Sequence, residues 1–154
     1  MGKSGEYKKQ NMFIGQFEHA IDEKNRLAIP VKFRRAISGG AVITKGLDGC
    51  LFLFTSEKFK KMAQSIGELP LTKSSARVYA RLILAGASDV EFDKQGRVIL
   101  PQYLRDYAGL THVSIVVGVY DRIEIWDKSK WGKTVEKLDS KVGKITEELS
   151  DLGV

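Results

Sequence analysis

The chain has 154 residues, of which 43% are hydrophobic and 29% are charged, so it forms one compact domain or two small ones and carries enough apolar surface for a core. Wholesale disorder and a large multidomain assembly are therefore excluded. Lys and Arg number 25 and Asp and Glu number 19, so the net charge is +6. This charge favours a polyanionic partner, of which nucleic acid is the first candidate, but it does not require one.

The chain begins with a polar, basic segment, residues 1–11 (MGKSGEYKKQN). No apolar segment follows it, so it is not a secretory signal, and we set it apart from the fold as a native extension or a cloning remnant. The longest uncharged apolar stretch, near Leu82 to Ala87, is far shorter than the ~20 residues of a membrane span. The single cysteine, Cys50, forms no intrachain disulfide and indicates a reducing compartment. We expect a cytoplasmic protein.

The chain repeats itself once. EHAIDEKNRLAIPVKFRRAI in the first half has the same layout as DVEFDKQGRVILPQYLRDYA in the second. Three residues recur at one constant separation: Asp22 with Asp93, Arg26 with Arg97, and Pro30 with Pro101. After one inserted loop residue, three more pairs correspond: Gly46 with Gly118, Phe54 with Trp126, and Phe59 with Trp131. We divide the chain into the extension, a first unit (12–71), a connecting helix (72–86), a second unit (87–131) and a C-terminal amphipathic helix (132–154).

In each half, an alternating strand leads into a D-x-x-x-R turn, and a short apolar strand follows at 27–29 or 98–100. The fourth position of the turn is Asn25 or Gly96, the residue types that most readily adopt a positive φ. The aspartate at the first position can close an Asx turn. Pro30 and Pro101 then stand where a helix is expected to begin, because proline suits the first helical turn.

Two further strands per half are predicted as hairpins, at 41–45 with 51–54 and at 113–118 with 122–126. Thr55 and Asp127 can each cap a following helix. The pairs Phe54 with Phe59 and Trp126 with Trp131 stand at hydrophobic-staple positions. Since one half of about 70 residues buries only a marginal core, we expect the two β units to pack together as one pseudo-twofold barrel.

Two helices remain. Residues 74–84 predict a connecting helix that carries Arg77 and Arg81 four residues apart. The tail shows a heptad seam made of Trp131, Val135, Leu138, Val142, Ile145, Leu149 and Leu152. This seam either packs against its own barrel or joins subunits, and Gly132 and Gly143 weaken a free-standing coiled coil. Both alternatives stay open.

The sequence contains no convincing catalytic or metal site. Asp22 and Asp93 suggest a carboxylate dyad, but Glu23 and Lys94 follow them where such a site needs small residues. The segment Gly132-Lys133-Thr134 lacks the glycine-rich loop of a phosphate site. The two histidines, at positions 19 and 112, have no ligand set around them. We expect neither an enzyme nor a protein with a metal or cofactor.

The two turns instead carry side chains that suit double-stranded DNA: Lys24, Asn25 and Arg26 on the first, and Lys94, Gln95 and Arg97 on the second. Arginine grips guanine or phosphate, Asn and Gln read adenine, and lysine contacts phosphate. The alternative is that each arginine pairs with the aspartate of its own turn and only steadies it. The first turn lies in the more basic part of the chain and is the better DNA-binding candidate.

The segments GQFEHAIDEKNRLAIPVKFR, ARLILAGASDVEFDKQGRVILPQYLRDYAGL and GVYDRIEIWDKSKW resemble the MraZ family of bacterial transcriptional regulators. The resemblance runs from about Met12 to the C-terminus and includes both D-x-x-x-R motifs. It implies an α+β, mainly β fold: a duplicated AbrB-like swapped-hairpin barrel with flanking helices and a long C-terminal helix. It also implies a ring-shaped homo-oligomer that is associated with the nucleoid. The ring would bind repeated DNA boxes and repress its own operon, the division and cell wall gene cluster.

Carried over by position, the motif's arginines are Arg26 and Arg97, which the family links to DNA contact, and Arg77 and Arg81 also match the family pattern. The first copy has Asn25 where the family has glycine, and we expect the turn to survive because asparagine tolerates a positive φ. A different hypothesis is an AbrB- or antitoxin-like protein-interaction module, like antitoxins that use a related barrel to dimerise and a tail to wrap a partner. A tail helix that joins subunits favours the ring regulator, whereas a disordered tail that folds on a partner favours the module.

Overall fold

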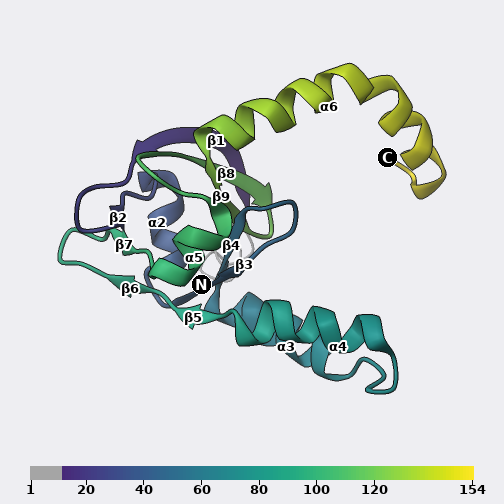
Figure 1. Ribbon diagram of the computed structural model, residues 1–154, viewed down its shortest axis with the longest axis horizontal. Coiled ribbons are helices and arrows are strands. Elements are labelled where there is room, and N and C mark those ends of the chain that lie inside the picture. Colours follow the sequence, from purple (N-terminus) through teal and green to yellow (C-terminus); the bar gives the residue numbers. More distant parts are fainter. Residues whose placement is uncertain (1–11) are drawn as a thin grey trace, which may run out of the picture.

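The computed structural model describes residues 12–154 (Figure 1). A six-stranded antiparallel sheet forms its centre, with the strands in the spatial order β1 (Phe13–Ala20), β8 (Val113–Tyr120), β9 (Ile123–Asp127), β4 (Leu51–Thr55), β3 (Ala41–Lys45) and β5 (Ser88–Asp89). A smaller sheet contains β2 (Arg26–Leu27), β7 (Val98–Ile99) and β6 (Glu91–Phe92). The fold is mixed α+β, as the sequence predicts.

The expected barrel is not confirmed, since neither sheet closes on itself within residues 12–154. The strand that begins the second half is broken into β5 and β6, which belong to different sheets. Between them, the Val90 N–H donates to the carbonyl of Ala41 at 2.9 Å. The larger sheet is therefore open, with β1 and β5 as its two edge strands.

The two halves of the chain are interleaved. Strand β1 of the first half pairs with β8 of the second along all its length, from Phe13 opposite Tyr120 to Ala20 opposite Val113. Strand β5 of the second half pairs in turn with β3 of the first, and β4 pairs with β9. The halves therefore share one sheet, in agreement with the expectation that the two units pack together.

One short helix per half covers this sheet. Helix α2 (Val31–Ile37) and helix α5 (Gln102–Ala108) begin directly after Pro30 and Pro101, which confirms the predicted helix starts. Each helix buries one face in a core that both halves build, including Phe33 and Leu104. The ring of Phe33 packs edge-on against Phe13 and Phe17 of β1 at centroid distances of 5.3 and 5.4 Å.

The central strands are buried on both faces. In β4, Leu51 and Leu53 face the main core, whereas Phe52 and Phe54 face a second cluster that also contains Cys50 and Trp126. Helix α3 (Ser56–Gly67) and the first turn of helix α6 (Lys128–Leu149) pack against this second cluster. Alternation along the strand therefore supplies two hydrophobic layers, one on each side of the sheet.

Both predicted helix caps are confirmed. The Thr55 hydroxyl accepts from Lys58 N at 3.1 Å, and Asp127 accepts from Lys130 N at 3.2 Å. The two staples also form, with ring centroids 6.1 Å apart for the Phe54–Phe59 pair and 5.4 Å apart for the Trp126–Trp131 pair. Each helix start is thus fixed by a cap and an aromatic contact.

The connecting helix and the tail differ in detail from the prediction. The connecting segment is helix α4 (Ser74–Ala80) continued by a π-helical turn at Arg81–Ala85, and it forms a hairpin with α3. Helix α6 begins at Lys128 and ends in a 3₁₀ turn at Ser150–Leu152. Both the α3–α4 hairpin and α6 extend away from the body (Figure 1). No helix among the described residues is long and apolar enough to span a membrane.

Candidate nucleic-acid interface

Each D-x-x-x-R segment folds as the predicted Asx turn. In the first turn, Asp22 Oδ1 accepts from the backbone N–H groups of Lys24 and Arg26, both at 2.9 Å, and Oδ2 accepts from Arg26 Nε at 2.6 Å. The second turn repeats the three bonds at the same distances with Asp93, Gln95 and Arg97. One side chain thus organises each turn.

The fourth position of each turn has the predicted backbone conformation. The φ angle is 63° at Asn25 and 77° at Gly96. The Asn25 N–H donates to the Asp22 carbonyl at 2.9 Å, and the Gly96 N–H donates to the Asp93 carbonyl at 3.0 Å. Asparagine and glycine therefore serve the same geometry, and the departure from the family pattern at position 25 leaves the turn intact.

The two turns also contact each other, because β2 and β7 pair directly after them. Arg97 Nη1 lies 3.6 Å from Asp22 Oδ2, and Arg26 Nη1 lies 3.9 Å from Asp93 Oδ2. We call these four residues the Asp–Arg cluster. Each arginine pairs with the aspartate of its own turn and with that of the other turn, so the cluster ties the two halves together.

The cluster changes the electrostatic picture of the turns. Its two carboxylates balance its two guanidinium groups, and only 27% of the Arg26 side chain and 26% of the Arg97 side chain are exposed. The ion pairs considered as an alternative to DNA binding are therefore present. Most of each arginine side chain is covered, and a DNA-binding role for Arg26 and Arg97 stays a prediction.

The pKa values of both aspartates are lowered. At Asp22 the main cause is the hydrogen bond from the Arg26 backbone N–H, which outweighs the opposing effect of burial. At Asp93, burial is the largest single influence and raises the pKa, but hydrogen bonds from the backbone and side chain of Arg97 together lower it. Both carboxylates are thus held in the charged form, whereas a catalytic dyad needs one carboxyl to keep its proton.

The lysines and glutamine of the turns are more accessible than the arginines. Lys24, Lys94 and Gln95 are exposed to solvent, and Asn25 is partly exposed. Outside the neutral cluster, the cationic groups that the turns offer to a polyanion are Lys24 and Lys94, and the exposed Glu23 carries a negative charge beside Lys24.

The structure adds two arginines that the sequence reasoning missed. Arg34 Nε donates to the Ile29 carbonyl at 2.8 Å, and Arg105 Nε donates to the Leu100 carbonyl at 3.1 Å. The two residues occupy the same place in the two halves, one on α2 and one on α5. Arg34 and Arg105 are separated in the sequence by the same number of residues as Asp22 and Asp93. This repeat is the signal in the sequence that points to them.

Helix α2 of the first half lies beside the turn of the second half. A hollow of about 300 Å³ is lined there by Arg34, Ser38, Phe92, Asp93, Lys94 and Gly96. Helix α2 also carries Lys32 and Arg35, whereas α5 has Asp106 beside its Arg105. The structure therefore places basic side chains next to the second turn, although the sequence favoured the first turn as the DNA-binding candidate.

Other candidate residues lie elsewhere. Arg77 is on α4, where its Nη1 donates to the Leu71 carbonyl at 3.1 Å, far from the turns (Figure 1). The segment Gly132-Lys133-Thr134 lies inside α6, and the Thr134 hydroxyl donates to the Lys130 carbonyl. Within the described residues, no group of three or more His, Cys, Asp or Glu side chains is arranged to hold a metal ion.

Cys50 is fully buried, and burial raises the pKa of its thiol to about 12. The thiol therefore stays protonated at neutral pH. A protonated thiol is a poor nucleophile and a poor metal ligand.

Comparison with known proteins gives one family. Residues 12–82 and 83–151 each match the model of the MraZ protein family, whose description likens it to antitoxins. A protein of Clostridium acetobutylicum named Transcriptional regulator MraZ is 45% identical over 145 residues, covering 93% of this chain and all of the relative. Proteins with the same name from Natranaerobius thermophilus and Thermomicrobium roseum are each 43% identical, covering 93% and 92% of this chain and 100% and 99% of their own lengths. The chain belongs to the MraZ family.

Proposed function

We propose that this protein is a DNA-binding transcriptional regulator without enzymatic activity. It binds repeated boxes in double-stranded DNA upstream of its own operon, the division and cell wall gene cluster, and represses that operon. It acts in the cytoplasm, associated with the nucleoid, as a ring of identical subunits, and it needs no cofactor or small-molecule substrate. The shared name of the relatives, Transcriptional regulator MraZ, supports regulation as the general role.

The observation that carries the proposal is the pair of turns held side by side by the Asp–Arg cluster. The cluster fixes the turns relative to each other, with Arg26 and Arg97 each engaging both aspartates. The exposed Lys24 and Lys94 lie one on each of these turns. We call the two turns together, residues 22–26 and 93–97, the platform. Cations on two turns that are tied together can contact neighbouring phosphates of duplex DNA.

The arginines have two roles in this proposal. Their Nε and Nη1 atoms face the aspartates and brace the turns. About a quarter of each side chain stays exposed, which leaves one edge of the guanidinium group for a phosphate or a guanine. Arg34 adds a third cation beside Lys94.

We also infer that the two units correspond to exchanged hairpins of the AbrB type. The support is the reciprocal pairing of the first strand of each half with the first hairpin strand of the other half. Strand β1 of the first half lies on β8 of the second, and β5 of the second half lies on β3 of the first. Each half thus contributes one strand to the sheet region of the other half.

Binding to DNA from upstream of the protein's own gene tests the function, with fluorescence anisotropy measured from low to high salt. Lys24→Ala and Lys94→Ala each remove one exposed cation from the platform, so each is expected to weaken binding and to reduce the slope of log affinity against log salt by about 0.9. Lys133→Ala is the matched control, because it removes one exposed lysine from α6. Equal affinities and slopes for all four proteins would contradict the proposed interface.

Oligomerisation contributes to recognition in this proposal, since tethered subunits on successive boxes gain about 10²- to 10⁴-fold in avidity. The second candidate function, an antitoxin-like protein-interaction module, is favoured by the exposed apolar residues of α6, among them Leu138 and Val142. Light scattering separates the two functions. A monomer at micromolar concentration that does not bind the upstream DNA would favour the module.

A further inference from the structure

Helix α6 leaves the body after its first two turns. Its beginning is anchored: Trp131 Nε1 donates to Gln16 Oε1 at 3.0 Å, and Lys130 Nζ donates to the Ala108 carbonyl at 3.0 Å. From residue 136 to residue 154, every residue except Ile145 is exposed. The alternative in which the tail packs along its own body is therefore wrong beyond Val135.

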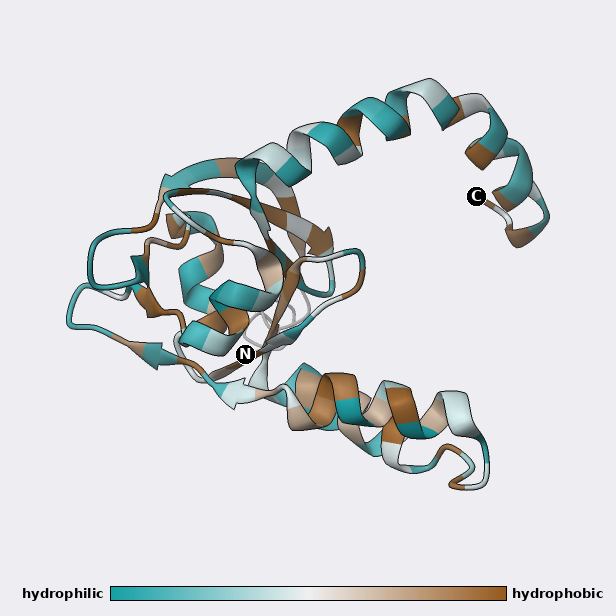
Figure 2. Ribbon diagram, in the orientation of Figure 1, coloured by the Kyte–Doolittle hydropathy of each residue, from teal (hydrophilic) through white to brown (hydrophobic). Residues whose placement is uncertain are grey.

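The free part of α6 carries an apolar stripe, which we call the α6 seam: Leu138, Val142, Ile145, Leu149 and Leu152. Four of its members are exposed, from 39% at Leu149 to 73% at Leu152. Figure 2 shows brown, hydrophobic bands along a helix that is otherwise mostly hydrophilic. A free helical segment of about 14 residues is marginally stable in water, and Gly143 weakens it further. Packing of the apolar stripe against another surface would therefore stabilise this part of the helix.

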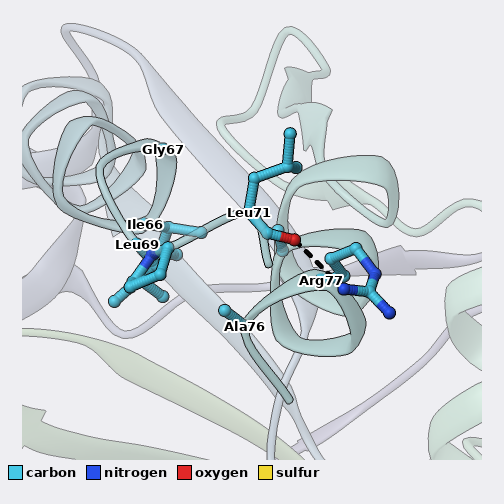
Figure 3. A pocket seen from close by; sticks show the side chains of 8 residues that line it. Ile66, Gly67, Leu69, Leu71, Ala76 and Arg77 are labelled. Carbon is cyan, nitrogen blue, oxygen red and sulfur yellow. Dashed lines mark hydrogen bonds between the residues drawn. The ribbon is translucent and has the colours of Figure 1, made fainter. Parts of the chain in front are cut away.

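The α3–α4 hairpin offers such a surface on the same molecule. A hollow of about 190 Å³, which we call the hairpin hollow, is lined by Ile66, Gly67, Leu69, Pro70, Leu71, Ala76, Arg77 and Ala80. Figure 3 shows it between the end of α3 and the start of α4, with Leu71 and Arg77 at its rim. Leu71 is 81% exposed and Leu69 is 42% exposed.

The size and lining of the hollow indicate what it can take. Pockets for small ligands measure about 300 to 1,000 Å³ and hold several converging polar groups. This hollow is smaller, and Arg77 is its only charged lining residue, already bonded to the Leu71 carbonyl at 3.1 Å. Such a surface suits one or two aliphatic side chains from an amphipathic helix.

The charges of the two surfaces are complementary. Residues 56–81, which contain the hairpin, carry six basic and two acidic side chains. The last ten residues of the chain carry three acidic side chains, Glu147, Glu148 and Asp151, and no basic ones. Lys73 and Arg81 are exposed near the hollow, so the acidic end of α6 approaches a basic surface when the seam enters it.

The two surfaces do not meet within one chain, because α6 and the α3–α4 hairpin extend as separate arms (Figure 1). We infer that the α6 seam of one subunit docks into the hairpin hollow of a second copy of this chain. Such a contact joins unlike surfaces, so an open assembly always has a free hollow at one end and a free seam at the other. Further subunits add there until the two ends meet and close a ring. The inference rests on the self-association proposed above and assigns the surfaces that produce it.

Complementation between two defective variants tests the docking. Leu69→Ser/Leu71→Ser damages the hollow, and Leu149→Ser/Leu152→Ser damages the seam. Neither variant introduces a charge, and all four positions are exposed, so both proteins are expected to keep the wild-type circular dichroism spectrum. Val31→Ser is the control, because it removes an apolar side chain that is 75% exposed on α2, outside both surfaces.

Light scattering at micromolar concentration gives the readout. The wild type and Val31→Ser are expected as oligomers, and each defective variant alone as a monomer of 17.2 kDa. An equimolar mixture of the two variants is expected to give a dimer and nothing larger, since only one intact seam and one intact hollow can pair. A hollow variant that stays oligomeric, a mixture that stays monomeric, or a monomeric wild type would overturn the docking.

DNA binding separates this inference from the proposed function. If the docking is right and the function is wrong, the variants complement each other as described while no form binds the upstream DNA. If the function is right and the docking is wrong, the wild type binds DNA as an oligomer, and both variants bind it with unchanged stoichiometry and affinity.

Discussion

The turn of the second half provides a test of the backbone argument. Gly96 has a φ of 77°, and a Cβ added there would meet only Arg34 Cδ, at 4.0 Å. Gly96→Ala therefore has a conformational cost of about 1–2 kcal/mol and no steric one. The smaller entropy of the unfolded alanine chain offsets about 0.4–1 kcal/mol. We expect a net loss of about 1 kcal/mol in the free energy of unfolding, or about 2–4 °C in Tm for a chain of this size.

Two further variants make this prediction specific, with unfolding followed by calorimetry and by urea titration. Gly96→Asn should lose less than Gly96→Ala, because Asn25 already adopts a φ of 63° at the equivalent position. Gly118→Ala should lose more, about 1–3 kcal/mol, because its Cβ would lie 2.5 Å from the backbone nitrogen of Ile14. The reasoning is refuted if Gly96→Ala is as stable as the wild type, or if Gly96→Asn and Gly96→Ala lose equal stability.

Three more outcomes are expected. Arg26→Ala should lower both Tm and DNA affinity, because it removes the ion pairs that brace the turns and a cation together. Arg26→Lys keeps the cation, so it should bind DNA better than Arg26→Ala while still having a lower Tm than the wild type. An unchanged Tm for Arg26→Ala would contradict the bracing role of Arg26. Folding lowers the pKa of Asp22 and Asp93, so each contributes stability above the ordinary value of 3.8 that is lost as the pH falls through the lower folded value; urea midpoints of Asp22→Asn/Asp93→Asn should therefore depend less on pH below about 4 than those of the wild type. The Cys50 thiol, with a pKa of about 12, should react with a thiol reagent such as a maleimide only in denaturant, and rapid labelling of the native protein would show that it is not enclosed.

The sequence was sufficient for features that depend on neighbouring residues. Asp22 and Asp93 close their turns, Asn25 and Gly96 adopt a positive φ, and Thr55 caps its helix, all as predicted. Each of these features involves residues no more than four positions apart, and the repeat allowed each to be inferred twice.

The sequence was not sufficient where distant segments meet. The Asp–Arg cluster arises because β2 and β7 pair across the two halves, so neither copy of the motif alone indicates that Arg26 also faces Asp93. The separation of β5 from β6 likewise depends on the partners that each strand finds. Arg34 lies beside Lys94 for the same reason, since a helix of one half packs near the turn of the other.

Both turns belong to one polypeptide, so a substitution can change one turn and leave the other as it is. In a symmetric dimer of single units, any substitution would appear in both turns at once. Here Glu23 corresponds to Lys94, and Lys24 to Gln95, so the two ends of the platform already differ in chemistry while the aspartates and arginines that hold them remain the same. The platform consequently has a polarity, and a duplex lying across it in one direction is not equivalent to the same duplex reversed.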